Sequence, residues 1–76
     1  MKKIQILGGG CANCEALYKN AKTAAEELGI EFEMEKITEL ADITDFGVMV
    51  TPALAVDGDV KFSGKVATVE EIKKVL

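Results

Sequence analysis

The sequence predicts one α/β domain over residues 1–76, in which helices flank a four-stranded mixed sheet in the order β-α-β-α-β-β-α. Three observations carry this prediction. Apolar residues recur at helical spacing after an N-terminal apolar run. A segment in which apolar residues and glutamates alternate follows this helix. An Asp-Gly pair then separates two strand-like runs of residues. A chain of 76 residues has room for one core, and no linker-like stretch divides it.

The first half predicts a strand, a helix and a second strand. The apolar run of residues 3–7 ends at three glycines, which indicates a buried strand followed by a loop. Residues 12–28 form an amphipathic helix that Gly29 ends, and residues 30–35 alternate between apolar residues and glutamates, as in a half-buried edge strand. A right-handed crossover makes the two strands parallel. The helix residues assigned to the core are Leu17, Ala21, Ala24 and Leu28.

The second half predicts a short helix, a hairpin and a last helix. Thr38 is placed to cap a helix that has Leu40, Ile43 and Phe46 on one face. The Asp57-Gly58 pair between two apolar runs is a strong hairpin signal, which adds antiparallel strands to the sheet. Thr68 and Glu71 have the spacing of a capping box at the start of the last helix.

Cys11 and Cys14 are the candidate catalytic residues. Dithiol chemistry needs one ionised sulfur that attacks a disulfide and a second sulfur that resolves the mixed disulfide. Cys11 is expected at the start of the helix, where unpaired N–H groups and the helix dipole favour a thiolate. Cys14 lies one turn further along, which suits the resolving role. The pair is too close in sequence to link distant segments, so it is interpreted as chemical and not structural.

Two other interpretations of the cysteines remain open. They could be incidental small residues of the core. They could also hold copper or a similar soft metal as a two-coordinate carrier, whereas a closed zinc site needs four ligands and the chain offers two sulfurs and no histidine. A small heavy-metal-binding domain also has an early Cys-x-x-Cys, but here Gly9 stands where its methionine would be and the last element is a helix.

The charge balance and the short N-terminal apolar run argue against nucleic-acid and membrane partners. Thirteen acidic residues against nine lysines give a net charge of −4 without a basic stripe, so nucleic acid is not an expected partner. The N-terminal apolar run is too short for a signal peptide or a membrane span, which favours a cytoplasmic protein without membrane binding. No metal or organic cofactor is expected.

The order of these motifs resembles the thioredoxin superfamily in its short, glutaredoxin-sized form. A strand, Cys-x-x-Cys and a helix are followed by Thr51-Pro52 before a hairpin and then by Gly64 and a last helix. The chain is most similar to the small single-domain redox-active disulfide proteins of archaea and bacteria. The resemblance implies a cis peptide bond before Pro52, a substrate segment paired with the Thr51 backbone, and a loop that passes close to the site at Gly64.

The resemblance also implies an activity and its partners. It implies a monomeric protein-disulfide oxidoreductase that works through a mixed disulfide and is restored by a flavin-dependent, thioredoxin-reductase-like enzyme or another dithiol reductase. Two departures are visible. Ala12-Asn13 replaces the usual Gly-Pro pair between the cysteines. Counting back from Cys11, Gln5 falls where thioredoxins bury an aspartate as a proton relay, and an amide cannot titrate.

Overall fold

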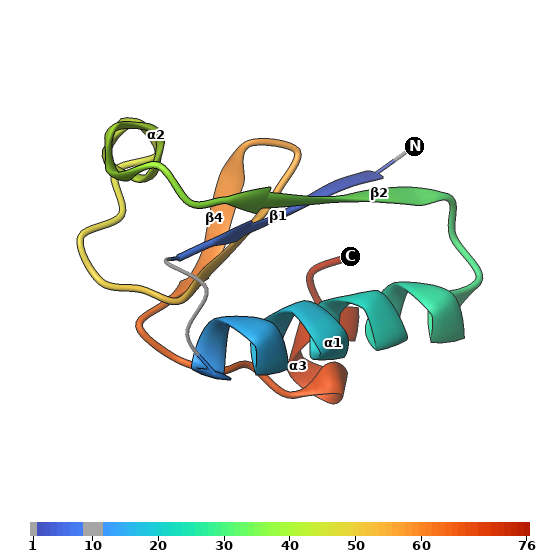
Figure 1. The fold of residues 1–76 in the computed structure, drawn as a ribbon. Helices are drawn as coiled ribbons and strands as arrows, with labels where there is room; N and C mark the ends of the chain where they lie inside the picture. The colour runs from blue at the N-terminus through green and yellow to red at the C-terminus, as the bar shows by residue number, and fades with distance from the viewer. Residues whose placement is uncertain (1, 9–11) are drawn as a thin grey trace.

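The computed structural model describes residues 2–8 and 12–76 and has the predicted order of elements (Figure 1). This order confirms the β-α-β-α-β-β-α prediction. The elements are β1 (Lys2–Leu7), α1 (Ala12–Leu28), β2 (Phe32–Ile37), α2 (Leu40–Asp45), β3 (Ala53–Val56), β4 (Asp59–Ser63) and α3 (Val69–Lys73).

The strands form one four-stranded mixed sheet in the order β2-β1-β3-β4. β1 and β2 are parallel, with Ile4 opposite Met34, and β1 pairs antiparallel with β3. β3 and β4 form the predicted hairpin, which has an irregularity between Leu54 and Ala55. The glutamate-rich β2 is at an edge of the sheet, as its alternating charges predict.

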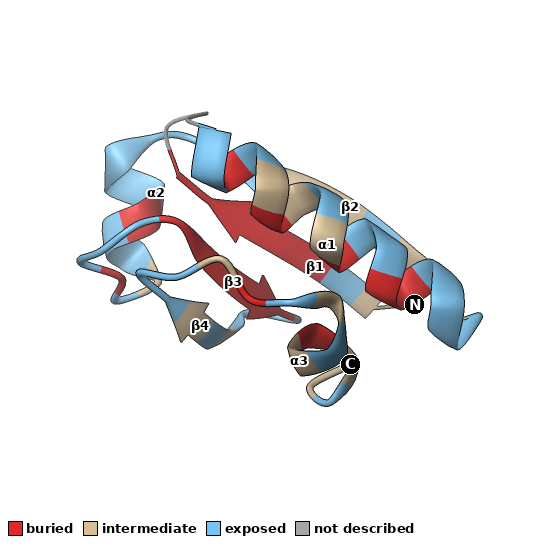
Figure 2. Ribbon diagram, turned by 90° about the horizontal axis from the view of Figure 1, so that it is seen from below, coloured by how far each residue is buried: buried red, intermediate tan, exposed pale blue. Residues whose placement is uncertain are grey.

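The helices lie on both faces of the sheet. α1 and α3 cover one face, and α2 lies over the other face at the end where β1 and β2 finish (Figure 1). Ile4 and Ile6 of β1 pack in the cluster on the α1 side, whereas Leu7 packs in the smaller cluster with Ile43 of α2. Buried residues concentrate on β1 and β3, which lie inside the sheet between the two helical layers (Figure 2).

The C-terminus of α1 has the predicted geometry, but one of its core assignments is wrong. Gly29 has a φ of 68°, and the N–H of Ile30 donates to the Ala25 carbonyl at 3.4 Å, as in a Schellman motif. Leu28, expected in the core, is 42% exposed. It is the last residue of α1.

The start of α2 also differs from the prediction. The helix begins at Leu40 with Glu39 as its N-cap and no side-chain capping bond, so Thr38 lies too early to cap it. Leu40 is 77% exposed, because a helix of this length reaches the sheet mainly through Ile43.

The start of α3 is as predicted. The Glu71 N–H donates to Thr68 Oγ1 at 3.2 Å and the Thr68 N–H donates to Glu71 Oε1 at 3.1 Å, which confirms the capping box. Within the described ranges, the molecule has no helix with the length and apolar character needed to cross a bilayer.

Candidate functional site

Cys14 lies in the first turn of α1, on the side of the helix that faces the sheet. Only 5% of the residue is exposed. Cys14 is buried because it lies on the apolar face of the amphipathic helix, together with Leu17 and Ala21, which are fully buried. Cys11 lies outside the described residues, so its position and attacking role stay a prediction. Among the described residues, α1 runs from Ala12 to Leu28.

Gly8 lies against the sulfur of Cys14. A Cβ built on Gly8 would overlap Cys14 Sγ and would be 3.8 Å from the Cα of Pro52. The Gly8 N–H continues the sheet by donating to the Ile37 carbonyl at 2.9 Å. The end of β1, the first turn of α1 and the start of β3 therefore meet at one point. Sequence reasoning did not single out Gly8, although its place as the first glycine after a buried strand was a usable signal.

Pro52 and Gly64 lie side by side next to this point. The Thr51-Pro52 peptide bond is cis, as the resemblance implies. Pro52 is buried and Thr51 is exposed. The Gly64 N–H donates to the Pro52 carbonyl at 2.9 Å, which confirms that the loop after the hairpin passes close to the proline. Substrate contacts of Thr51, Pro52 and Gly64 remain predictions.

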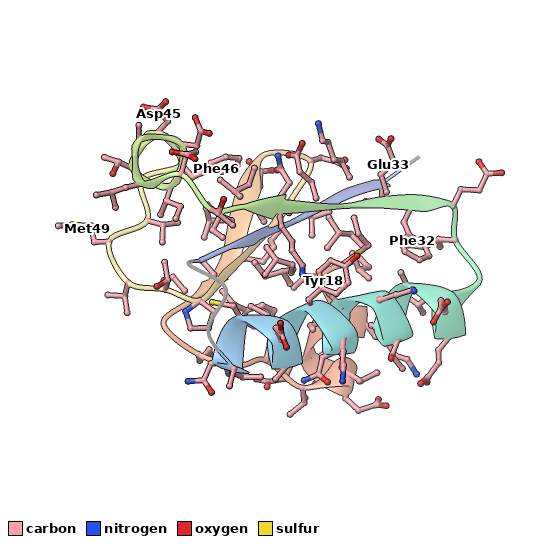
Figure 3. All side chains as sticks on the ribbon, viewed as in Figure 1. Tyr18, Phe32, Glu33, Asp45, Phe46 and Met49 are labelled. Carbon is pink, nitrogen blue, oxygen red and sulfur yellow. The ribbon has the colours of Figure 1, made fainter. Side chains whose placement is uncertain are left out.

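Two apolar side chains precede Thr51 on the surface. Met49 is 96% exposed and Val50 is 59% exposed. Met49 extends away from the molecule (Figure 3). A Cβ on Gly64 would lie 2.9 Å from Cγ1 of Val50, so Val50 occupies the space beside that glycine. The segment before the cis-proline thus presents apolar surface next to the site.

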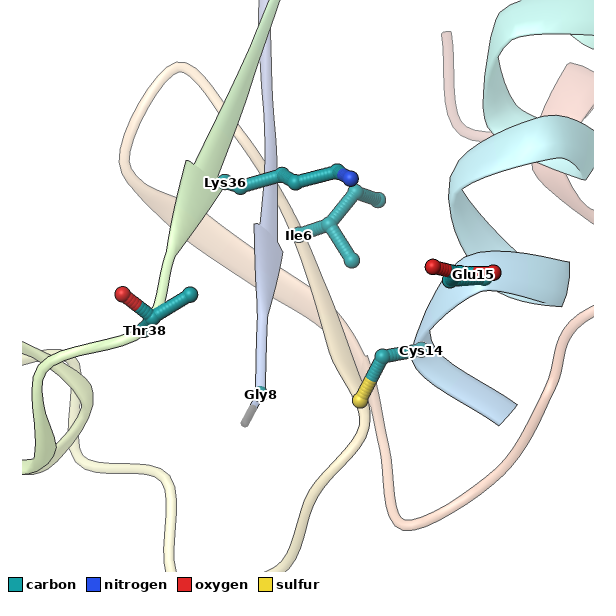
Figure 4. Close-up of a pocket in the computed structure, with 6 residues that line it drawn as sticks. All are labelled: Ile6, Gly8, Cys14, Glu15, Lys36 and Thr38. Carbon is teal, nitrogen blue, oxygen red and sulfur yellow. The ribbon is translucent and has the colours of Figure 1, made fainter. Parts of the chain in front are cut away.

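A pocket opens beside Cys14 between the start of α1 and the end of β2 (Figure 4). Lys36 extends from β2 toward α1, and Glu15 lies on the facing side of the opening. Sequence reasoning did not identify Lys36. Because side chains alternate between the two faces of a strand, Lys36 lies on the same face of β2 as Phe32 and Met34. This alternation was the sequence signal from which its position could have been predicted. The lining residues are Ile6, Gly8, Cys14, Glu15, Lys36 and Thr38.

The assignment of Gln5 to the position beside the cysteines is wrong. Its neighbours Ile4 and Ile6 face α1, and successive side chains of a strand point to opposite faces, so Gln5 points away from Cys14. Its amide donates to Glu35 Oε1 at 3.0 Å. Counting back from Cys11 fails because it ignores strand parity. The strand residue that lines the Cys14 pocket is Ile6.

The Gln5–Glu35 contact shifts the titration of the carboxyl group on this opposite face. The hydrogen bond from Gln5 lowers the pKa of Glu35 below its usual value, and the nearby charge of Lys3 acts in the same direction. The Gln5 carbonyl oxygen Oε1 is buried without a hydrogen-bond partner in the described part of the chain. These groups lie across the sheet from the cysteine pocket and do not contribute to it.

Among residues 2–8 and 12–76, no group of three or more cysteine, aspartate or glutamate side chains is arranged to hold a metal ion. Cys11 lies outside these ranges.

Comparisons with known proteins agree with the geometry. A family model described as a thioredoxin domain matches residues 2–76. A thioredoxin of Methanothermobacter thermautotrophicus is 57% identical over 76 residues, which cover 100% of this chain and 99% of that protein. A thioredoxin of Methanocaldococcus jannaschii is 46% identical over 76 residues, covering 100% of this chain and 87% of that protein.

A third relative is more distant. A probable thioredoxin of Methanothermobacter marburgensis is 33% identical over 57 residues, or 71% of this chain and 67% of that protein. None of these matches supports the metal-carrier alternative. Because the family model and two relatives span essentially the whole chain, this chain belongs to the thioredoxin superfamily and is a disulfide oxidoreductase of the thioredoxin type.

Proposed function

We propose that the protein reduces disulfide bonds of other proteins through Cys11 and Cys14. One observation carries the proposal: in a chain of the thioredoxin superfamily, Cys14 is buried where Gly8 and the cis-proline Pro52 meet, three residues after a second cysteine. A buried sulfur at this place suits the resolving role, and the attacking role falls to Cys11.

The proposed reaction has two thiol–disulfide exchanges. The Cys11 thiolate attacks one sulfur of the substrate disulfide, so a mixed disulfide forms and the other substrate sulfur leaves as a thiolate that takes a proton from water. Cys14 then loses its proton, and its thiolate attacks the Cys11 sulfur of the mixed disulfide. The second substrate sulfur leaves as a thiolate, and Cys11 and Cys14 end as a disulfide. The substrate gains two electrons and the dithiol loses them.

We place the substrate beside the segment from Met49 to Pro52. Thr51 is exposed directly before the cis-proline, so its backbone is available to an extended peptide. The apolar surface of Met49 and Val50 would cover apolar side chains that flank the target disulfide. Gly64 stabilises the segment from Met49 to Pro52, because its N–H donates a hydrogen bond to the Pro52 carbonyl and the absence of a side chain leaves room for Val50.

The reaction needs an external reductant to restore the dithiol. We assign this role to a flavin-dependent, thioredoxin-reductase-like enzyme or another dithiol reductase. A reducing cytoplasm is the compartment in which such a cycle runs, and a monomer with one domain suffices for it.

Single-cysteine variants test the proposal. Insulin reduction is followed with excess dithiothreitol as the reductant for the wild type, C11S and C14S. Both variants are expected to lose catalysis, because each lacks one of the two sulfurs that the exchange requires. In a separate incubation without dithiothreitol, prereduced C14S should accumulate a covalent mixed disulfide with insulin on a non-reducing gel, since no second thiol resolves it, whereas C11S should not.

The assignment of the two roles has its own readout. At near-neutral pH, iodoacetamide should modify Cys11 faster than Cys14, because Cys14 is almost fully covered. A wild type that fails to reduce insulin above the rate of dithiothreitol alone would overturn the proposed activity. A mixed disulfide that accumulates on C11S and not on C14S would reverse the roles of the two residues.

A further inference from the structure

Lys36 is the one cationic side chain that lines the Cys14 pocket among the described residues. It lies on edge strand β2, on the face that looks toward α1. The pocket walls from β1 are Ile6 and Gly8, which carry no charge, and Thr38 at the end of β2 is neutral as well. Charge at this opening therefore comes from Lys36 on the strand and from Glu15 on the helix.

The ring of Tyr18 fixes where the Lys36 ammonium lies. The Lys36 Nζ is 4.8 Å from the centroid of the Tyr18 ring, within the range of a cation–π contact. Tyr18 is four residues after Cys14, so both side chains emerge from the same face of α1 one turn apart. Tyr18 lies between the sheet and α1 in Figure 3. The helix that carries Cys14 thus also carries the ring that contacts the Lys36 ammonium, and Lys36 and Cys14 line the same pocket.

We propose that Lys36 is a positioning residue for the redox reaction, whose charge, held by Tyr18, favours the thiolate of Cys14 when that sulfur resolves the mixed disulfide. The inference rests on the proposed function. The inference concerns the step in which Cys14 loses its proton. The strand before the cysteines offers no titrating group for this step, because the residue that faces the pocket is Ile6 and not a carboxylic acid.

The physical reason is the cost of ionising a covered thiol. Burial disfavours the thiolate and raises a thiol pKa, whereas a cation nearby lowers it. The pocket gives Cys14 a path to water between α1 and β2, so the thiol proton leaves to solvent while the ammonium stays charged. Lys36 takes no proton and forms no bond in this step. Glu15 carries the opposite charge at the same opening and should act in the opposite direction.

Titration of a single thiol tests the proposal without requiring catalysis. In the C11S background the remaining thiol is Cys14, and thiolate absorbance at 240 nm gives its pKa. Lys36→Met should raise that pKa by about 0.5–1 unit, since Lys36 lines the same pocket as Cys14 but is exposed, so that water and salt partly screen its charge. Lys36→Arg should restore most of the shift. Glu15→Gln should lower the pKa, and Tyr18→Leu should raise it less than Lys36→Met does.

Lys61→Met is the matched control. Lys61 is an exposed lysine on β4, at the sheet edge opposite β2, so its removal changes the net charge equally but leaves the pocket intact. In the protein with both cysteines, Lys36→Met should slow disappearance of the mixed disulfide by about three- to tenfold at pH 7, whereas Lys61→Met should not.

The outcomes separate this inference from the proposed function. If the wild type reduces insulin and Lys36→Met shifts the Cys14 pKa no more than Lys61→Met, Lys36 has no such role and the proposed function stands. If Lys36→Met and Glu15→Gln shift the pKa in the same direction, the cause is a change of packing and the electrostatic inference is wrong. A wild type that reduces no disulfide removes the proposed function, whatever the titration gives.

Discussion

Gly8 and the sulfur of Cys14 are in such close contact that no side chain fits between them. The position of a Cβ on Gly8 is already occupied by Cys14 Sγ. The backbone at the end of β1 therefore forms one wall of the space around the sulfur, and the first turn of α1 can lie directly on the sheet. A larger residue at position 8 must push the sulfur or the helix away, which links the packing of this turn to the redox site.

Gly8→Ala is expected to lower stability and slow resolution. Overpacking at a close contact costs about 1–3 kcal/mol of unfolding free energy, which urea unfolding in excess dithiothreitol measures. The matched test is a double-mutant cycle with Cys14→Ala, which removes the sulfur that the new methyl would meet. In that background Gly8→Ala should cost less than half as much. An equal cost in both backgrounds would mean that the Cys14 sulfur is not the obstacle.

Gly64→Ala is expected to damage both stability and activity. Gly64 has a φ of 72°, and a Cβ there would lie 2.9 Å from Cγ1 of Val50. The left-handed backbone alone costs an alanine about 1–2 kcal/mol. The methyl must also displace Val50, which precedes the segment that we assign to substrate binding, so the KM for insulin should rise.

Gly47→Ala separates the two effects of the Gly64 change. Gly47 has a φ of 79°, and no described atom lies within 4 Å of the place where its Cβ would be. It should therefore carry the backbone cost without the contact. We expect the two variants to lose comparable stability, and we expect the KM for insulin to rise only in Gly64→Ala. A raised KM in both variants would show that the loss of stability, and not the position of Val50, controls substrate binding.

The sequence predicted the order of elements because its signals are local. The apolar spacing of α1, the Asp57-Gly58 turn and the capping box of Thr68 and Glu71 each act within a few residues, and each is present in the structure. Thr38 was assigned wrongly as the cap because the pattern indicated a helix but not its first residue. Short helices are the elements whose ends depend most on tertiary contacts.

The site was predicted less completely than the fold. The motif named Cys14 and Pro52, but the contact of Gly8 with the sulfur depends on how closely α1 approaches β1, which no sequence pattern gives. Gln5 was misassigned by counting residues along the chain, although strand parity decides which side chain faces the helix. The sequence did not indicate Lys36, because no motif includes this lysine and its face of β2 otherwise carries the apolar residues Phe32 and Met34.

The start of α3 contains a carboxylate whose ionisation is coupled to folding. A hydrogen bond from Lys65 is the main cause that lowers the pKa of Glu71 below its usual value of 4.5, and the Thr68 N–H adds to it. Lys65 Nζ is 2.7 Å from Glu71 Oε2. Because the pKa is lower in the folded state than in the unfolded state, the contribution of this carboxylate to stability is present above about pH 4.5 and is lost as the pH falls through the folded value.

Glu71→Gln should weaken the dependence of stability on acid. Urea midpoints of the wild type and the variant are compared at pH 7 and pH 3.5, with the dithiol kept reduced by a phosphine that works at both values. The wild type should lose more stability between the two, because only its side chain 71 takes up a proton on unfolding. Glu33→Gln on β2 is the control, since Glu33 is exposed and distant in sequence from the cap. If Glu71→Gln loses as much stability between pH 7 and pH 3.5 as the wild type does, the Lys65 and Thr68 contacts do not couple this carboxylate to folding.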